Sequence, residues 1–509
     1  MKNKKILVIS LFASLSFSGY AQEADEIKTV NIAGIEQDVK ESAASISIIS
    51  GEDLTKRSAK NVTNSLYGYG LGLTTLQNSG HYATQEPTLY VRGMQTLSDN
   101  KGPLTLVDGI ERDIKLITPE EVESVQILKD AAAVALYGYK GANGVINIIT
   151  KRGKYNTREI KFSYDHVINW EARRPEFVDG YTYALAVNEA LANDGVRKPR
   201  YHELELDAFK SGNYPYFYPN VNWMDEVFKN TAATNLYNIS FRGGGAKFRY
   251  YALLNLTTDK GFIDNANMND GYSTQNKYSK ANLRTNLDID LTSTTKMTVN
   301  LLGTLAETSR PGDNADLWSM IYQLPPTAFP VRTENGLWGG SITWAGTLNP
   351  VAQSQATAYT KGHNRSLYAD MTLKQDLSSI LPGLGGSFKL AYDNYAAYVE
   401  NHSKTYRYGI DYVAWASGKP TAGTQNVFGT ESPMGTDSDM SEWKRNFNSA
   451  LGLDYQYASD KHAVYTQLMW NHEYRNLNGT NQTWYRENLT SYTHYGYKGR
   501  YFADLSMAV

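Results

Sequence analysis

The sequence predicts a small α+β domain followed by a transmembrane antiparallel β-barrel, of which about half is present. Three observations lead to this prediction. The chain starts with an export signal, a stretch rich in short strands and tight turns follows, and from Ile160 onward long segments alternate between apolar and polar residues. With 509 residues, 41% of them hydrophobic, the chain is long enough for more than one domain.

Composition excludes several classes of protein. The mean hydropathy of -0.47 argues against a bundle of membrane-spanning helices. There is no Cys, so the chain has no disulfide, no thiolate metal site and no lipidated N-terminal Cys. The formal net charge of -2 does not suggest a nucleic-acid-binding protein. Tyr is abundant, with 38 residues, which is expected where aromatic side chains line membrane interfaces.

Residues 1–21 have the pattern of a secretory signal peptide. Three of the first five residues are lysines, Ile6 to Phe17 form an apolar run, and Gly19 and Ala21 provide a cleavage site before Gln22. The alternative is a membrane anchor, but the apolar run is shorter than the ~20 residues that a spanning helix needs.

The segments that follow Ile160 alternate with the period of β-strands. In Ala281 to Leu291 the apolar residues lie on one face and Asn, Arg and Asp residues on the other. Three hairpins are predicted: residues 235–242 with 247–257, 281–291 with 297–305, and 450–457 with 462–470. About eleven such segments are expected, each close to the ~9–11 residues that a membrane strand requires.

Connection lengths favour a membrane barrel over a soluble β-sandwich. Tight turns alternate with long connections rich in Gly, Asn, Tyr and Pro, such as residues 171–234 and 307–362. Eleven is an odd number, and the last segment still alternates at Val509. Because an open sheet edge cannot face lipid, we expect a longer protein whose remaining strands close a barrel of about 22 strands.

The α+β domain is predicted from capping and strand patterns. Thr118 and Glu121 form a capping box around a Pro at the first helical position. Residues 122–129 and 144–150 have strand patterns, and between them Asp130 caps a short helix over residues 131–137. Gly138 is expected to end this helix in the left-handed conformation.

Three stretches resemble a known family. They are "YVRGM" (residues 90–94), "PLTLVDGI" (103–110) and "VESVQILKDAAAVALYGYKGANGVINIITKRG" (122–153), which resemble the plug domain of TonB-dependent outer-membrane transporters. The form of the last stretch is similar to the SusC/RagA branch. The resemblance implies four regions: a signal peptide (1–21), an N-terminal tail (22–45), a plug domain (46–155) and the N-terminal part of an outer-membrane barrel (156–509).

The resemblance implies active import rather than an enzyme activity. The expected cargo is a nutrient, an oligosaccharide or a peptide, and the expected partners are TonB with its inner-membrane energising complex, a SusD-like surface lipoprotein and outer-membrane lipid. A siderophore or vitamin receptor is an alternative, and a passive porin or surface-binding protein is another. The branch's usual "YGSRGANG" is "YGYKGANG" here, which puts the bulky Tyr139 in a turn where a small residue is usual.

The candidate functional residues are structural rather than catalytic. The resemblance implies that Arg92, with Gly93, ties the plug to barrel carboxylates, and a buried arginine needs such a partner. Asp108 and Gly109 fit a tight turn. The remaining motif positions of the plug are Lys129, Asp130, Gly138, Gly141 and Gly144, and the TonB box candidate is Thr29, Val30, Asn31 and Ile32.

Other sites are not predicted. Gly138, Gly141 and Gly144 are not followed by Lys-Ser/Thr, so their spacing is not that of a phosphate-binding loop. We expect no catalytic set, no metal site, no cofactor and no nucleic-acid partner. Lys151 and Arg152 are expected at the junction of plug and barrel as a solvated pair.

Overall fold

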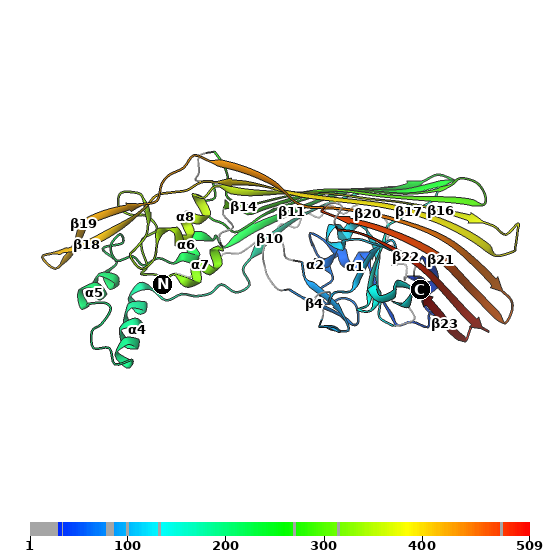
Figure 1. Ribbon diagram of the computed structural model, residues 1–509, viewed down its shortest axis with the longest axis horizontal. Helices are drawn as coiled ribbons and strands as arrows, with labels where there is room; N and C mark the ends of the chain where they lie inside the picture. The colour runs from blue at the N-terminus through cyan, green and yellow to red at the C-terminus, as the bar shows by residue number, and fades with distance from the viewer. Residues whose placement is uncertain are drawn as a thin grey trace, which may run out of the picture.

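The computed structural model describes residues 29–32, 34–77, 86–97, 101–130, 134–267, 271–312, 316–478 and 482–509. The predicted signal peptide therefore lies outside the described residues. Figure 1 shows two parts, a small mixed domain drawn mainly in blue and cyan, and a wide curved sheet that passes over it.

The small domain is built on a five-stranded sheet with the order β3-β8-β9-β6-β7. Its strands are β3 (Ile46–Ser50), β6 (Leu104–Val107), β7 (Ile110–Glu111), β8 (Val122–Leu128) and β9 (Val145–Thr150). Only β6 and β9 pair in parallel. Strands β8 and β9 are buried along nearly their whole length, as expected for strands covered on both faces. Both strands were predicted, and the structure confirms them.

Short elements cover this sheet. They are α1 (Gly51–Thr55), α2 (Val62–Ser65), β4 (Leu73–Leu76), β5 (Thr88–Val91), η1 (Ile114–Leu116), η2 (Pro119–Glu121) and η3 (Ala135–Gly141). The predicted capping box of Thr118 and Glu121 is present, but it opens a single 3-10 turn. The predicted helix over residues 131–137 lies partly outside the described residues, and from Ala135 onward the chain is a 3-10 helix. The core holds Leu54, Val107, Val125 and Ile148, all fully buried.

The large sheet has eleven antiparallel strands, in agreement with the prediction. They are β10 (Arg158–Trp170), β11 (Thr231–Gly244), β12 (Phe248–Lys260), β13 (Lys277–Asp290), β14 (Thr295–Pro311), β16 (Tyr359–Asp376), β17 (Leu384–Ser403), β20 (Gly435–Ala458), β21 (His462–Leu477), β22 (Thr483–Tyr497) and β23 (Tyr501–Ala508). All three predicted hairpins are present, as β11–β12, β13–β14 and β20–β21.

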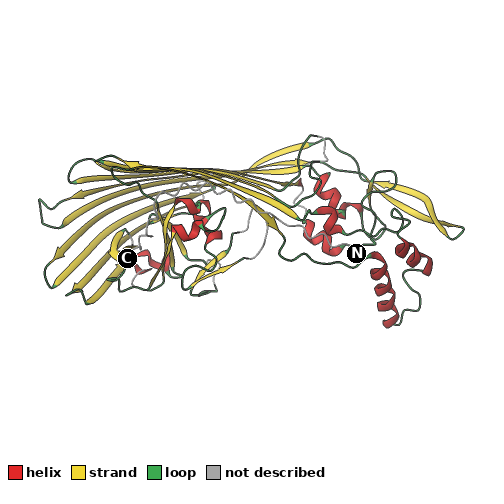
Figure 2. Ribbon diagram, turned by 180° about the vertical axis from the view of Figure 1, so that it is seen from behind, coloured by secondary structure: helices red, strands yellow, loops and turns green. Residues whose placement is uncertain are grey.

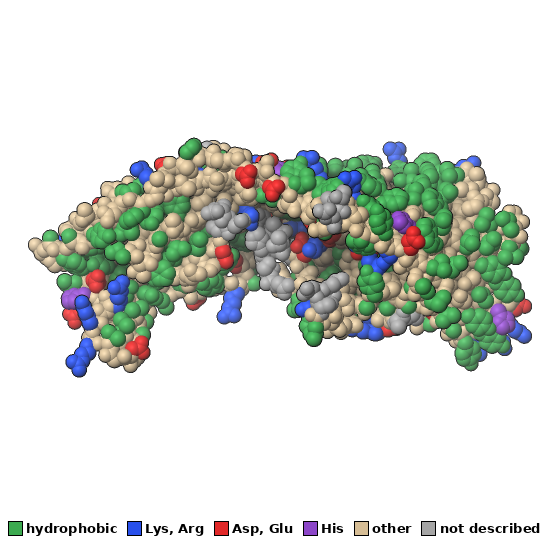
Figure 3. Space-filling model, in the orientation of Figure 1, with side chains coloured by type: hydrophobic (Ala, Val, Ile, Leu, Met, Phe, Trp, Pro, Cys, Tyr) green, Lys and Arg blue, Asp and Glu red, His purple; other side chains and the backbone are tan. Residues whose placement is uncertain are grey.

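The alternation along these strands separates two faces. In β13, Asn282, Arg284 and Asn286 are buried, whereas Leu283 is 52% exposed. The small domain lies against the concave face of the sheet, so the buried polar side chains meet it (Figures 1 and 2). The exposed leucines point the other way, toward lipid, and hydrophobic side chains cover much of the strand surface on the right of Figure 3.

Tight turns join the strands at one end of the sheet and long connections at the other (Figure 2). This asymmetry identifies the end with the long connections as extracellular. These connections are folded, with a core of their own that includes Trp223, Ile321 and Phe329. Their elements are α4 (Gly180–Asn193), α5 (Glu203–Ser211), α6 (Trp223–Val227), α7 (Leu317–Gln323), α8 (Pro350–Gln355), η5 (Gly346–Leu348), β15 (Trp338–Gly339), β18 (Tyr408–Ala416) and β19 (Lys419–Phe428).

A two-stranded hairpin of β1 (Thr29–Ile32) and β2 (Ile35–Asp38) precedes the small domain. Within the described part of the chain, no helix combines the length and apolarity needed to cross a membrane.

Candidate functional site

The interface between the small domain and the sheet is polar and charged. The sheet contributes buried Asn, Asp, Arg and Lys side chains, and the small domain supplies opposite charges and carbonyl groups. Burying charges without partners costs several kcal/mol per ion, so each of these groups needs a partner.

Arg112 makes the most buried of these contacts. It follows β7, and its side chain is 1% exposed. Its Nη1 donates to Asp370 Oδ2 at 2.7 Å, and its Nη2 donates to Asp393 Oδ1 at 2.8 Å. The guanidinium also lies over the Tyr368 ring, 5.1 Å from the centroid. One arginine of the small domain thus bridges β16 and β17 of the sheet.

Glu121 makes a second buried ion pair with the sheet. Here the acid lies in the small domain and the arginine lies in the sheet. Besides completing its capping box, it accepts from Arg284 Nε at 2.5 Å and from Asn282 Nδ2 at 3.2 Å. Glu121 is fully buried and the side chain of Arg284 is 2% exposed. The same carboxylate therefore caps the start of η2 and holds the domain against β13.

Asp108 and Gly109 form the predicted turn. Their φ values are 50° and 78°, and they join β6 to β7. The Asp108 carboxylate accepts from Thr150 N at 3.0 Å and Oγ1 at 2.7 Å. Burial raises the pKa of Asp108, but Arg152 and Arg284 and the Thr150 hydrogen bonds outweigh it, so the pKa lies below its usual value. The Asp108 carbonyl accepts from Lys389 of β17 at 3.0 Å.

The junction residues Lys151 and Arg152 are not a solvated pair, and this prediction was wrong. Arg152 donates to Asn300 Oδ1 at 2.6 Å and lies 3.4 Å from Asp288 Oδ1, both on the sheet. Lys151 is packed beneath the sheet, and burial lowers its pKa. The chain passes from one part to the other at the interface, where Lys151 and Arg152 are only partly exposed.

A second charged cluster involves the turn in which Tyr139 departs from the family pattern. The Lys140 ammonium contacts Glu111 at 2.5 Å and Glu473 of β21 at 3.0 Å, and Arg475 contacts Glu111 at 2.5 Å. Tyr139 is 78% exposed and carries Arg486 of β22 over its ring, 4.3 Å from the centroid. The bulky side chain therefore points out of the turn and does not disturb the fold of the domain.

Arg92 does not make the contact predicted for it. Among the described residues its acidic partner is Asp130 of the same domain, with Nη2 and Oδ1 2.6 Å apart, and its side chain is 50% exposed. Arg92 and Gly93 both have positive φ, 56° and 83°, and form a tight bend after β5. Arg112, which sequence reasoning missed, makes the contact to sheet carboxylates instead.

Lys129 and Asp130 hold the N-terminal part of the domain. Lys129 Nζ donates to Ser47 Oγ at 2.8 Å and to the Leu71 carbonyl at 3.0 Å. Asp130 accepts from the backbone N–H of Ser45 at 2.7 Å. These contacts are internal to the domain and consistent with the structural role expected for the motif.

Of the three motif glycines, Gly144 is the most constrained. Its φ is +87°, and a Cβ there would lie 2.7 Å from Val91 Cβ. Gly138 has the expected positive φ of 58°, but its ψ of -147° is outside the left-handed helical region and accessible essentially to glycine alone. At Gly141 a Cβ would meet the Val134 carbonyl at 2.7 Å.

The TonB box candidate forms β1. Val30 and Ile32 are buried, the Asn31 N–H donates to Gln126 of β8 at 2.9 Å, and Tyr492 of β22 packs against the same cluster. The partner strand β2 is tied to the sheet through Gln37, whose amide lies 2.7 Å from His494 Nδ1. A segment in this state is not free to pair with another protein, and its assignment as the TonB box stays a prediction.

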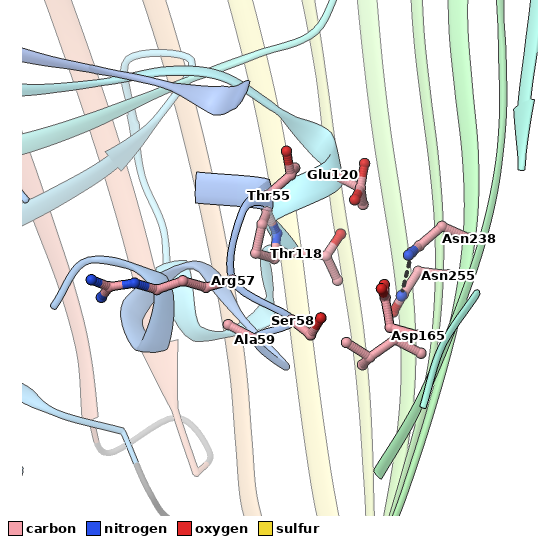
Figure 4. A pocket seen from close by; sticks show the side chains of 11 residues that line it. Thr55, Arg57, Ser58, Ala59, Thr118, Glu120, Asp165, Asn238 and Asn255 are labelled. Carbon is pink, nitrogen blue, oxygen red and sulfur yellow. Dashed lines mark hydrogen bonds between the residues drawn. The ribbon is translucent and has the colours of Figure 1, made fainter. Parts of the chain in front are cut away.

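A small cavity separates the two parts near α1 (Figure 4). Thr55, residues 57–59 and residues 118–120 line it from the small domain, and Asp165, Leu236, Asn238 and Asn255 line it from the sheet. Asn255 Nδ2 donates to Asn238 Oδ1 at 2.6 Å, which holds both amides on the wall. Polar groups from both sides line most of this gap, and apolar contact between the two parts involves a few sheet residues, such as Leu302 and Tyr368, that pack against the core of the small domain.

Comparison with known proteins agrees with this architecture. Residues 38–145 match the TonB-dependent Receptor Plug Domain family. TonB-dependent receptor SusC of Bacteroides thetaiotaomicron is 24% identical over 255 residues, 48% of this chain and 23% of its own length. A TonB-dependent receptor of Formosa agariphila is 23% identical over 313 residues, 60% of this chain and 28% of its own length.

Among solved structures, a chain of the RagAB peptide importer in its open-open state superposes with a TM-score of 0.70 at 16% identity. The superposition covers 94% of this chain and 56% of that chain, so this chain spans about half the length of its structural neighbour. At this identity the likeness shows the fold alone.

The plug match and the strand sheet around it define a TonB-dependent receptor, and the chain accordingly belongs to the outer membrane. Within that class, the chain is similar in sequence to SusC, and its fold matches that of a RagAB chain. From here the small domain is called the plug and the large sheet the barrel wall.

Proposed function

We propose that the chain forms the plug and part of the barrel of an active importer, which carries an oligosaccharide or a peptide across the outer membrane. The observation that carries the proposal is the plug–barrel interface, which contains many buried polar and charged contacts, such as Arg112 with Asp370 and Asp393. Water that enters such an interface can solvate the separated charges, so the plug can move without exposing a large apolar surface.

The proposed energy source is TonB, driven by the inner-membrane complex. TonB would grip an extended segment by adding a strand to it. In the proposal this segment is Thr29 to Ile32, which must first leave its hairpin with β2, and the pull then passes through β3 into the plug sheet.

The similarity to SusC and the extracellular connections support the proposed cargo class. These connections expose aromatic side chains, including Tyr216, Tyr412 and Trp415. Flat aromatic faces bind sugar rings and apolar peptide side chains. Tyr218, in contrast, is buried in the cluster that joins α4 and α5, so it serves packing. A SusD-like lipoprotein that covers this end is the proposed partner.

The test is uptake by cells that express the full-length receptor, offered a panel of labelled oligosaccharides, peptides, ferric siderophores and cobalamin. We expect uptake of an oligosaccharide or a peptide, loss of uptake when the proton gradient is collapsed, and loss when residues 22–31 are deleted. Flux that survives both treatments would identify a passive pore. Energised uptake of only a siderophore or cobalamin would overturn the cargo class but not the transport class.

A further inference from the structure

A groove crosses the lipid-facing surface of the barrel wall. It is about 310 Å³ in volume and runs over β12, β13, β14 and β16. The register places Leu254, Leu283, Gly303 and Leu367 in one row across these strands. The three leucines are 38–52% exposed and face away from the plug.

Gly303 creates the groove. It is the glycine in a row of leucines, and no heavy atom lies within 4 Å of the position that its Cβ would occupy. Its φ is not positive, so the backbone does not require glycine there. The missing side chain leaves a channel walled by Leu283 and Leu367 and bounded along the strand by Leu301 and Leu305.

The extracellular end of the groove is cationic. Arg365 lines it directly and lies opposite Leu305. Arg445 lies two strands further on, in the same row as Leu367 and Asn394. Both arginines are exposed and stand at the boundary where the outward-facing residues of these strands change from apolar to polar. That boundary, on the side of the long connections, is the level of the outer-leaflet headgroups.

Neither arginine has a carboxylate partner within the described residues. The Arg365 guanidinium lies over the Tyr398 ring at 5.2 Å, and that of Arg445 lies over the Trp443 ring at 4.1 Å. Stacking fixes the planes of both groups but leaves their N–H donors unused. The nearest acids on this face, Glu307 and Glu400, contact His363 instead.

We propose that this surface binds one phosphorylated glycolipid of the outer leaflet, of the lipid A type. The phosphate accepts hydrogen bonds from Arg365 and Arg445, for which the guanidinium fork is well suited. Between the arginines lies the small Ala396, which is opposite both Arg365 and Trp443 and leaves room for the headgroup. An acyl chain of the same lipid fills the channel at Gly303. The inference rests on the outer-membrane location and is independent of the transported cargo.

The test uses the full-length receptor, purified in detergent and titrated with monophosphorylated lipid A, with bound lipid counted by native mass spectrometry. The double variant Arg365→Ala/Arg445→Ala should weaken retention by about tenfold or more, because charge-assisted hydrogen bonds are lost. Gly303→Leu should weaken it as well, without any change of charge. The matched control Lys260→Ala removes an exposed cation at the extracellular end of β12, away from the groove, and should retain lipid as the wild type does.

Heat-modifiable migration on gels verifies that each variant has a folded barrel. Equal retention by the double variant and the wild type would overturn the proposal, and so would equal retention of lipid A from which the phosphate has been removed. Normal retention by Gly303→Leu would overturn the groove as the acyl-chain site.

Discussion

At the scale of single residues, Arg112 contacts more buried charged groups of the barrel than any other described plug side chain does. It faces two carboxylates, both nearly inaccessible to water, so the cluster as a whole carries one net negative charge. Lys389 of β17, close to the same cluster, supplies a further positive charge. The cluster holds the plug in place only while all of its members are present.

Arg112→Met tests this dependence. Removing the guanidinium leaves Asp370 and Asp393 buried without their partner, which costs about 3–5 kcal/mol. We expect the plug to become sensitive to protease and the full-length receptor to leak small ions in planar bilayers. Arg92→Met is the matched control, because its exposed pair with Asp130 contributes only about 0–1 kcal/mol. Equal leakage by the two variants would contradict the assignment of the anchor to Arg112.

Gly144→Ala tests the close packing of the plug. The new Cβ would collide with Val91 and adopt a positive φ, so we expect a loss of about 2–5 kcal/mol in the free energy of unfolding. Gly93→Ala has a similar φ but open space around it, and should cost only about 1–2 kcal/mol. Denaturant titration of the plug measures both losses, and equal losses would show that packing against Val91 contributes nothing.

At the scale of elements, regular alternation was enough to predict the number of barrel strands and three of their hairpins. The period of two recurs in every barrel strand, and each short turn allows only one antiparallel partner. The folded extracellular connections were not predicted, because α6, α7 and α8 are short and are stabilised by a shared core such as Trp223 on Phe329. The sequence alone does not show which residues meet in that core.

The site was predicted only in part, for the same reason. The Asp108–Gly109 turn is local, so its residue types define it. Arg112 and Arg92 look alike in sequence, and only the tertiary fold decides which of them lies beside Asp370 and Asp393. Asp370 and Asp393 lie on the plug-facing side of β16 and β17, where a buried charge needs a partner, and neither strand was among the hairpins predicted from the sequence.

The hairpin of β1 and β2 gives a prediction at the same scale. Val30→Asp would bury a charge without a partner, so the hairpin should leave its place beside β8 and β22. We expect faster hydrogen exchange and proteolysis over residues 29–38, with the plug sheet unchanged. Thr29→Asp is the matched control, because Thr29 is exposed in the same strand. If residues 29–38 are as well protected in the Val30→Asp variant as in the wild type, burial of Val30 does not hold the hairpin in place.

At the scale of the whole molecule, plug and barrel are two folded parts whose interface contains several ion pairs. The pKa of Asp108 lies below its usual value, as described above. Burial raises the pKa of Glu111, but Arg475 and Lys140 lower it further, so its net shift is also downward. Of these two carboxylates, Glu111 pairs directly with the barrel through Arg475, so ionised carboxylates help to hold the two parts together, and the strength of the interface depends on pH.

The direction of this pH dependence follows from the lowered pKa values of the two carboxylates. A carboxylate whose pKa is lower in the folded state stabilises that state above its unfolded pKa, about 4, and the gain is lost as the pH falls through the folded value. We expect plug protection in the full-length receptor, measured by hydrogen exchange, to be constant from about pH 8 to 5 and to fall below about pH 4. Glu111→Gln should lower protection at pH 7, because Lys140 and Arg475 lose a shared anion, and should show a smaller further loss in acid. An acid response in Glu111→Gln as steep as that of the wild type would mean that the charges at this interface do not hold the plug.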